Sequence, residues 1–192
     1  MRAGIDERKL TTILVVDAAG YSSILTVADR SGTIELLCEC RALIDRLLAR
    51  HGGHIFDAAG DCVLAEFGSV VAAVQASVDL QLLLRRAQGA RPDRIRFRVG
   101  VALGDVIVKG ENLLGDGANI AERLERLAGP GGIVVAGNVR EEVEGKLKVT
   151  FDDLGEQALK NIPSPVRALR VVFTDEAMSG LAMAADREPA PY

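Results

Sequence analysis

Apolar residues recur along the chain with two different periods, which predict alternating strands and helices. Continuous apolar runs and strict apolar–polar alternation are typical of strands, and a repeat near 3.6 residues is typical of amphipathic helices. Helices are expected at 33–50, 70–88, 116–127 and 138–144. Strands are expected at 10–16, in a hairpin at 55–67, and at 95–102, 106–108, 133–136, 148–151, 157–160 and 166–173. Turn residues at 103–105 and a loop at 109–115 are expected to separate the elements beside them.

The first six elements are expected in the order strand, helix, strand, strand, helix, strand. This is the βαββαβ pattern of a ferredoxin-like sandwich, so the predicted fold class is α+β with extra C-terminal strands. One domain is expected over residues 10–173, after a polar lead at 1–9. The tail, residues 174–192, is rich in Ala, Met, Pro and Asp and is expected to be flexible or to dock a partner.

Composition limits the partners that the chain can have. The 192 residues are 48% hydrophobic with a net charge of −4, which suits one globular domain and argues against a protein that binds nucleic-acid backbones. No apolar run is long enough to span a bilayer, and the first ten residues lack the apolar segment of a signal peptide. A soluble, cytoplasmic protein without a membrane partner is therefore expected.

The hairpin expected at Ile55–Phe67 carries two acids near its tip. Two apolar runs meet at 58–61, where Gly60 can adopt a backbone conformation that other residues avoid. Asp57 and Asp61 would be held rigidly there, and a rigid carboxylate is a good ligand for Mg²⁺. Taken alone, the hairpin favours the simpler interpretation that both are ordinary turn acids.

A second acid, Asp17, follows the expected strand 10–16 and changes that interpretation. In the predicted sheet the end of this strand can lie beside the tip of the hairpin, which would bring Asp17 and Asp61 together. The next residues are small or hydroxyl-bearing and would let backbone N–H groups approach a phosphate: Ala18, Ala19, Gly20, Tyr21 and Ser22. Two carboxylates beside such a loop are typical of two-metal phosphoryl transfer.

Asn119 and Arg123 are four residues apart on the expected helix 116–127, so they share one face. An amide and a guanidinium at this spacing could hold a ribose and a phosphate. For Arg123 alone, a solvated helix charge is the simpler alternative. Asn119, however, is a poor helix former without an evident structural purpose.

Over about residues 9–173 the chain resembles the class III nucleotidyl cyclases, and is similar to their bacterial branch. The resemblance lies in five segments, VVDAAGYS, HGGHIFDAAGDCVLAEF, RVGVALGDVIV, LLGDGANIAERLE and GEQALKNIPSPVRALRV. It implies an enzyme that converts a nucleoside triphosphate into a 3′,5′-cyclic nucleotide and pyrophosphate for intracellular signalling. A diguanylate cyclase is disfavoured, because residues 59–63 lack the Gly-Gly-acid-Glu-aromatic hairpin of that fold.

The resemblance also implies roles for particular residues. Asp17 and Asp61 match the metal-binding aspartates for two Mg²⁺ or Mn²⁺ ions, with the Ala18 carbonyl as a further ligand. Asn119 matches the residue that orients the ribose, and Arg123 the arginine that stabilises the α-phosphate. Lys160 falls near the phosphate-binding lysine of the family. A head-to-tail homodimer is implied, in which one subunit supplies the metals and the other supplies Asn119 and Arg123.

The two base-reading positions depart from the adenylate-forming pattern, which has lysine and aspartate where this chain has Asp57 and Asn112. An ionised Asp57 could accept hydrogen bonds from guanine, and the Asn112 amide could donate to its O6 atom. Cytosine also fits this pair, and adenine stays open. Because both positions have changed, the alternative is a weakly active or inactive cyclase-like domain that binds nucleotide or a regulatory partner.

Overall fold

The computed structural model describes residues 7–20, 30–57, 62–90, 94–109 and 112–180. Its elements are β1 (Glu7–Ala18), α2 (Arg30–Arg50), β2 (His54–Asp57), β3 (Cys62–Phe67), α3 (Val70–Gln88), β4 (Phe97–Lys109), β5 (Asn112–Leu114), α4 (Asp116–Leu127), β6 (Ile133–Ala136), α5 (Gly137–Val143), β7 (Thr150–Gln157), β8 (Val166–Val172) and the 3₁₀ helix η1 (Asp175–Ala177).

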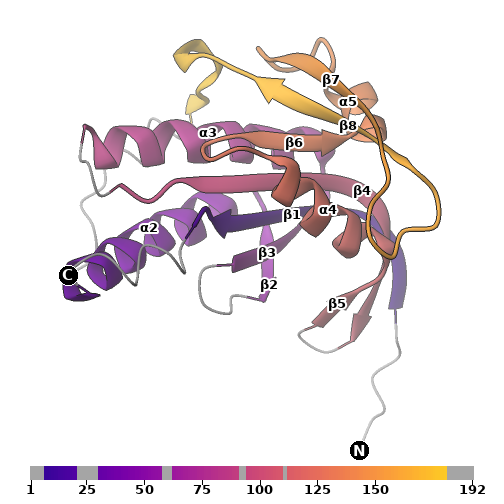
Figure 1. The fold of residues 1–192 in the computed structure, drawn as a ribbon, viewed down its shortest axis with the longest axis horizontal. Helices are drawn as coiled ribbons and strands as arrows, with labels where there is room; N and C mark the ends of the chain where they lie inside the picture. The colour runs from indigo at the N-terminus through magenta and orange to yellow at the C-terminus, as the bar shows by residue number, and fades with distance from the viewer. Residues whose placement is uncertain (1–6, 21–29, 58–61, 91–93, 110–111, 181–192) are drawn as a thin grey trace, which may run out of the picture.

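One mixed sheet organises the whole fold (Figure 1). Its strands lie in the order β2-β3-β1-β4-β6-β8-β7, and β5 pairs with β4 as a side ribbon. The first four strands, with α2 and α3 between them, form the predicted ferredoxin-like βαββαβ unit. The pair β4–β6 is parallel and the other pairs are antiparallel. The α+β fold with extra C-terminal strands is thus confirmed.

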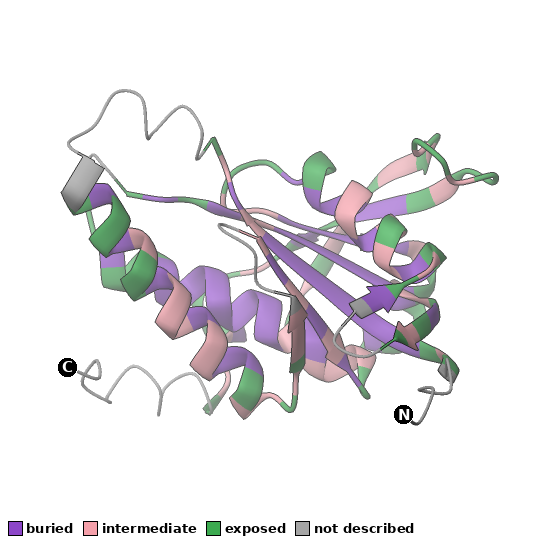
Figure 2. Cartoon of the chain, turned by 90° about the horizontal axis from the view of Figure 1, so that it is seen from below, coloured by how far each residue is buried: buried purple, intermediate pink, exposed green. Residues whose placement is uncertain are grey.

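Helices cover both faces of this sheet, which explains the continuous apolar run in β1. Ile13, Leu14, Val15 and Val16 are all fully buried, although successive side chains of a strand point to opposite faces. Helices α2 and α3 pack against each other, and α3 contacts β1 and β4. Figure 2 shows buried residues running through the middle of the sheet and along the helices beside it.

Helix α4 contacts β1, β4 and β6 at very short range. A Cβ atom built on Gly100 of β4 would lie 2.1 Å from the Ala121 carbonyl oxygen, so this helix touches the strand backbone itself. Gly104 makes a similar approach to Gly117, since its Cβ would lie 2.9 Å from the Gly117 Cα. Two glycines on the strand therefore allow α4 to sit almost in contact with the sheet.

The turn expected at 103–105 is wrong, because β4 runs without interruption through these residues. Leu103, Gly104 and Asp105 pair in register with residues 10–12 of β1. Gly104 is needed for the approach of α4 and does not break the strand. The loop expected at 109–115 is also wrong in part, since β5 returns as a short strand that pairs with the end of β4.

The C-terminal strands differ from expectation in number. The segments 148–151 and 157–160 were each expected to form a strand, but one strand, β7, covers 150–157. A register shift between Asp153 and Gly155 lets β7 bend and continue along β8. The irregular pattern in the sequence is therefore a bulge rather than a gap between two strands.

Residues 174–180, the start of the expected tail, lie against helix α3. Asp79 on α3 is fully buried and accepts hydrogen bonds from the Ser179 backbone N–H, at 2.8 Å, and from its hydroxyl. Gln75 donates to Asp79 at 3.0 Å and to the Ala177 carbonyl at 2.7 Å. This polar network fixes the segment on the domain, and residues 181–192 lie outside the described part. Among the described helices, none is long and apolar enough to cross a membrane.

Candidate active site

Asp17 lies near the end of β1, next to the strand that leads out of the hairpin tip. It pairs with Cys62 of β3 on one side and with Arg98 of β4 on the other. Strands β2 and β3 form the predicted antiparallel hairpin. Asp61 immediately precedes Cys62 in the sequence but lies outside the described residues, so its side chain is not placed. The observed register therefore brings the chain position next to Asp61 opposite Asp17.

A chain of charged side chains links Asp17 to helix α4. The Arg98 guanidinium donates from Nη2 to Asp17 Oδ2 at 2.5 Å. Its Nε lies 2.6 Å from Oε1 of Glu125, as an ion pair that is not aligned for a hydrogen bond. The Glu125 side chain is only 3% exposed, whereas those of Arg98 and Asp17 are 25% and 22% exposed. Arg98 thus connects the candidate metal ligand, Asp17, to the buried carboxylate of Glu125.

Burial raises the pKa of Glu125 to about 7 from its ordinary value of 4.5. The Arg98 guanidinium acts against this shift by favouring the carboxylate, while the charge of Asp17 adds to the shift. Desolvation is the larger effect. Glu125 is therefore a carboxyl group that changes charge near neutral pH directly behind the candidate site.

Asn119 and Arg123 both lie on α4, as the sequence predicted, and Asn119 is exposed. The Arg123 side chain is 19% exposed, and its Nη1 lies 3.4 Å from Glu122, an acid that also binds Arg126 at 2.6 Å. The Nε atom of Arg123 is buried without a hydrogen-bond partner. This guanidinium therefore has donor capacity that the described residues do not use.

The residues after Asp17 are only partly described. Ala18 closes β1, and the Ala19 N–H donates to the Arg96 carbonyl at 2.7 Å, so this N–H is already engaged. Gly20 is exposed with φ of 74°. Tyr21 and Ser22 lie outside the described residues. The expected phosphate loop can therefore be assessed only at its first residues.

The two expected base-reading residues belong to strands that contact each other. Asp57 ends β2 and Asn112 begins β5, and these strands meet although they are far apart in the sequence. The side chains of both residues lie outside the described part of the structure. Lys160, the expected phosphate ligand, is exposed in the turn that follows β7.

Sequence reasoning missed Arg98 and Glu125. Arg98 is one of several arginines that alternate with apolar residues in the sequence, and Glu125 was not singled out. The available signal was that Glu125 lies four residues after Ala121, in the helix row that contacts the sheet.

Comparisons with known proteins identify the family of the chain. The family model "Adenylate and Guanylate cyclase catalytic domain" matches residues 5–172. A Rhizobium meliloti (strain 1021) protein named "Putative adenylate cyclase 3" is 37% identical over 184 residues, which cover 95% of this chain and 31% of that protein. The chain thus spans about a third of the length of this curated relative.

Solved structures show the same fold. An adenylate/guanylate cyclase/hydrolase from Silicibacter pomeroyi has a TM-score of 0.81 and 32% identity, covering 88% of this chain and all of that one, 100%. The adenylyl cyclase CyaB from P. aeruginosa has a TM-score of 0.79 and 22% identity, covering 91% and 100%. Because the family model matches most residues of this chain, the chain belongs to the adenylate and guanylate cyclase catalytic domain family.

Proposed function

We propose that the chain is a metal-dependent nucleotidyl cyclase, which converts a nucleoside triphosphate into a 3′,5′-cyclic nucleotide and pyrophosphate. The observation that carries the proposal is the position of Asp17, at a strand end directly beside the hairpin, in a chain of the cyclase family. The 3′-hydroxyl of the ribose would attack the α-phosphorus, and pyrophosphate would leave.

The donor atoms near Asp17 fit a hard cation such as Mg²⁺ or Mn²⁺. Only Oδ2 of Asp17 is bound, to Arg98, so among the described residues Oδ1 has no partner and can ligate. Asp17, Asp61 and the Ala18 carbonyl would hold two ions. When bound, these ions would lower the pKa of the attacking hydroxyl and neutralise the triphosphate.

Arg123 and Asn119 would act on the substrate directly. Negative charge grows on the phosphoryl oxygens in the transition state, and a guanidinium with an unused, buried Nε–H is suited to stabilise it. Asn119, exposed one turn earlier, would orient the ribose. Lys160 would bind the outer phosphates. Among the described residues, the only acidic partner of these groups is Glu122, which lies 3.4 Å from Arg123 Nη1.

The helix geometry supports a site shared by two subunits. Ala121 and Glu125 face the sheet, and residues two positions away point about 200° around the helix. Asn119 and Arg123 therefore turn away from the Asp17 of their own chain. A head-to-tail homodimer would let each chain offer Asp17 to one site and Arg123 to the other.

Asp57 and Asn112 would read the base, since their strands contact each other. Asp57 would accept from N–H donors of the base, so GTP, or CTP, should compete well with ATP. Losing a hydrogen bond to a charged group costs about 1.5–3 kcal/mol, or about 10–150-fold in relative rate. The double change Asp57→Lys with Asn112→Asp should shift preference toward ATP by that factor. A strong preference for ATP that survives the double change would show that these residues do not read the base.

The function is tested by mass spectrometry of the products formed from each nucleoside triphosphate with Mg²⁺ or Mn²⁺. Asp17→Ala and Asp61→Ala should abolish cyclisation, and Arg123→Ala should lower it by about 10²–10³-fold. Arg126→Gln, an exposed neighbour on the same helix, is the matched control and should keep full activity. Near-normal turnover by either aspartate variant would contradict the metal assignment.

Subunit mixing tests the shared site. Asp17→Ala and Arg123→Ala chains should each be inactive alone. Equal mixing should restore about a quarter of wild-type activity, because half of the dimers are then heterodimers with one intact site of two. If the mixture stays inactive although mass spectrometry detects heterodimers, each chain must build its site alone.

A further inference from the structure

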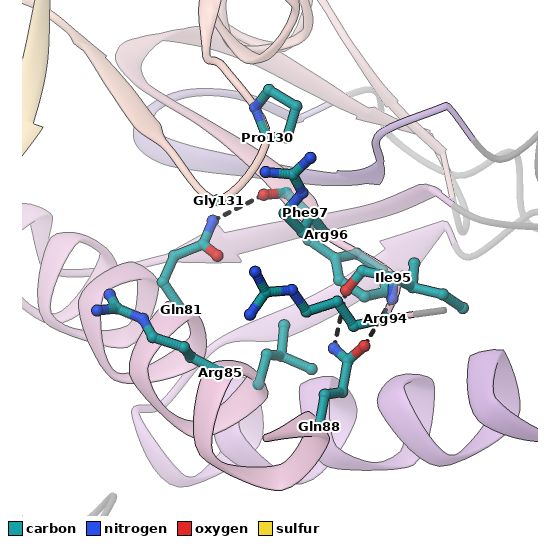
Figure 3. Close-up of a pocket in the computed structure, with 10 residues that line it drawn as sticks. Gln81, Arg85, Gln88, Arg94, Ile95, Arg96, Phe97, Pro130 and Gly131 are labelled. Atoms are coloured by element: carbon teal, nitrogen blue, oxygen red, sulfur yellow. Dashed lines mark hydrogen bonds between the residues drawn. The ribbon is translucent and has the colours of Figure 1, made fainter. Parts of the chain in front are cut away.

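A cavity lies at the C-terminal end of α3, and Asp17 is not among the residues that line it. Its volume is about 240 Å³, and it is enclosed by α3, by residues 94–97 and by the Pro130–Gly131 turn that follows α4 (Figure 3). The sequence pattern did not predict this cavity. Its chemistry can be read from two groups of side chains, which line its inner wall and its rim.

The inner wall of this cavity is already saturated with hydrogen bonds. Gln81 donates to the carbonyls of Phe97 and Gly132 at 3.0 and 3.1 Å. Gln88 donates to the Ile95 carbonyl at 2.8 Å and accepts from the Ile95 N–H at 2.6 Å. These two buried amides fix α3 to the start of β4 and have a structural purpose. They leave the rim to provide any recognition.

The rim carries three arginines, Arg85 from α3 and Arg94 and Arg96 from the segment before β4 (Figure 3). All three are exposed, and among the described residues none of them has an acidic partner. Among the described residues, nine other arginines form ion pairs with Asp or Glu: Arg8, Arg41, Arg86, Arg98, Arg123, Arg126, Arg140, Arg167 and Arg170.

Positive charge is therefore gathered at this cavity without a counter-charge from the residues that the structure describes. No acidic residue lines it, although the chain as a whole has a net charge of −4. Guanidinium groups approaching from two elements can each offer paired N–H donors to one oxyanion. The one aromatic residue in the lining, Phe97, is 2% exposed, so no ring is available to stack on a nucleoside base.

We propose that this cavity binds a small phosphate-bearing anion through Arg85, Arg94 and Arg96. None of these three side chains is assigned to cyclisation, although the Arg96 carbonyl accepts from the N–H of Ala19 in the expected phosphate loop. The proposal therefore does not depend on the proposed function. Its ligand is a free phosphate or a small phosphate ester without a stacked base. A carboxylate of similar size is the competing chemistry.

The test is isothermal titration calorimetry, which measures the dissociation constants of the full chain for inorganic phosphate and for malonate. EDTA silences any site that needs a divalent metal, and chloride keeps the ionic strength constant. Wild type should bind phosphate saturably and more tightly than malonate. Each of Arg85→Gln, Arg94→Gln and Arg96→Gln should weaken binding about tenfold or more, as expected for a lost charge-assisted hydrogen bond.

Arg46→Gln is the matched control, because Arg46 is also without an acidic partner among the described residues but lies on α2, outside the cavity. It should leave phosphate affinity unchanged. The single variants should keep the wild-type circular dichroism spectrum, since no ion pair is lost. The proposal is overturned if phosphate binding is not saturable, if the three variants bind phosphate as tightly as wild type does, or if malonate binds more tightly than phosphate.

Discussion

Replacing Glu125 by glutamine tests whether burial or the neighbouring arginine controls this carboxyl group. Glutamine keeps the shape of the side chain and removes its titration. Because the pKa of Glu125 is raised to about 7 in the folded protein, the folded state holds a proton that the unfolded chain releases above 4.5. The stability associated with the neutral carboxyl is therefore complete below pH 4.5 and is lost as the pH rises to about 7.

The size of the effect follows from the two pKa values. Raising a pKa from 4.5 to about 7 corresponds to about 3 kcal/mol. Wild type should lose about this amount of unfolding free energy between pH 4.5 and 8 through Glu125, and Glu125→Gln should not. The variant should therefore gain about 3 kcal/mol relative to wild type over this range. All other titrating groups are shared and cancel in the difference.

Urea unfolding at several pH values measures this difference. The chain has no tryptophan, so circular dichroism at 222 nm is the suitable signal, and EDTA keeps the site free of metal. Glu122→Gln is the matched control. Glu122 lies on the same helix, is 40% exposed and pairs with Arg126, so its loss should change stability by less than about 1 kcal/mol.

Two parallel stability curves for wild type and Glu125→Gln would refute the reasoning. They would mean that Glu125 titrates at its ordinary pKa, because the charge of Arg98 offsets the desolvation. A difference of the opposite sign, with the variant losing stability as the pH rises, would mean that the ionised pair is favoured even more strongly.

Three further changes have expected outcomes. Asp79→Ala removes the buried acceptor of Ser179 and should cost about 3 kcal/mol in urea unfolding, while exposing residues 174–180 to limited proteolysis; unchanged proteolysis would contradict the docking role. Gly100→Ala should cost at least about 3 kcal/mol, whereas Gly32→Ala, where a Cβ meets nothing within 4 Å, should be neutral or stabilising; equal midpoints would refute the backbone contact. Ser69→Ala removes the N-cap of α3 and should lower stability by about 1 kcal/mol, and no change would mean that water replaces the cap.

Helices were the most predictable part of the fold, because their signals are local. Helix α3 begins and ends where the sequence predicted, after the capping Ser69 and before Gly89. Helix α4 also matches its predicted bounds, 116–127. In both, apolar periodicity and the flanking residues indicate the same ends.

Strands were predicted less well wherever a glycine served tertiary packing. Gly104 was taken as a turn, but its purpose depends on Gly117, which approaches it from α4. Nothing in the sequence near Gly104 indicates that helix. The short strand β5 was missed for a related reason, because only its pairing with the end of β4 makes residues 112–114 a strand.

The candidate site also contains residues that local sequence could identify and contacts that it could not. Asp17, Asn119 and Arg123 could be selected from their local positions and from family resemblance, and their roles remain predictions. The link from Asp17 through Arg98 to Glu125 could not, because it requires the register of β1 against β4 and the face that α4 turns to the sheet. Sequence spacing predicts neither this strand register nor this helix face.

Helix α4 is the element on which these observations meet. Its inner row, Ala121 and Glu125, contacts the sheet backbone at Gly100. Glu125 also pairs with Arg98, which in turn binds Asp17. Its outer row carries Asn119 and Arg123. Because a close-packed backbone contact has no space to slide, the outer row can shift relative to Asp17 only if the inner contacts break. The inner-row contacts therefore hold Asn119 and Arg123 at a fixed distance from Asp17 within each chain.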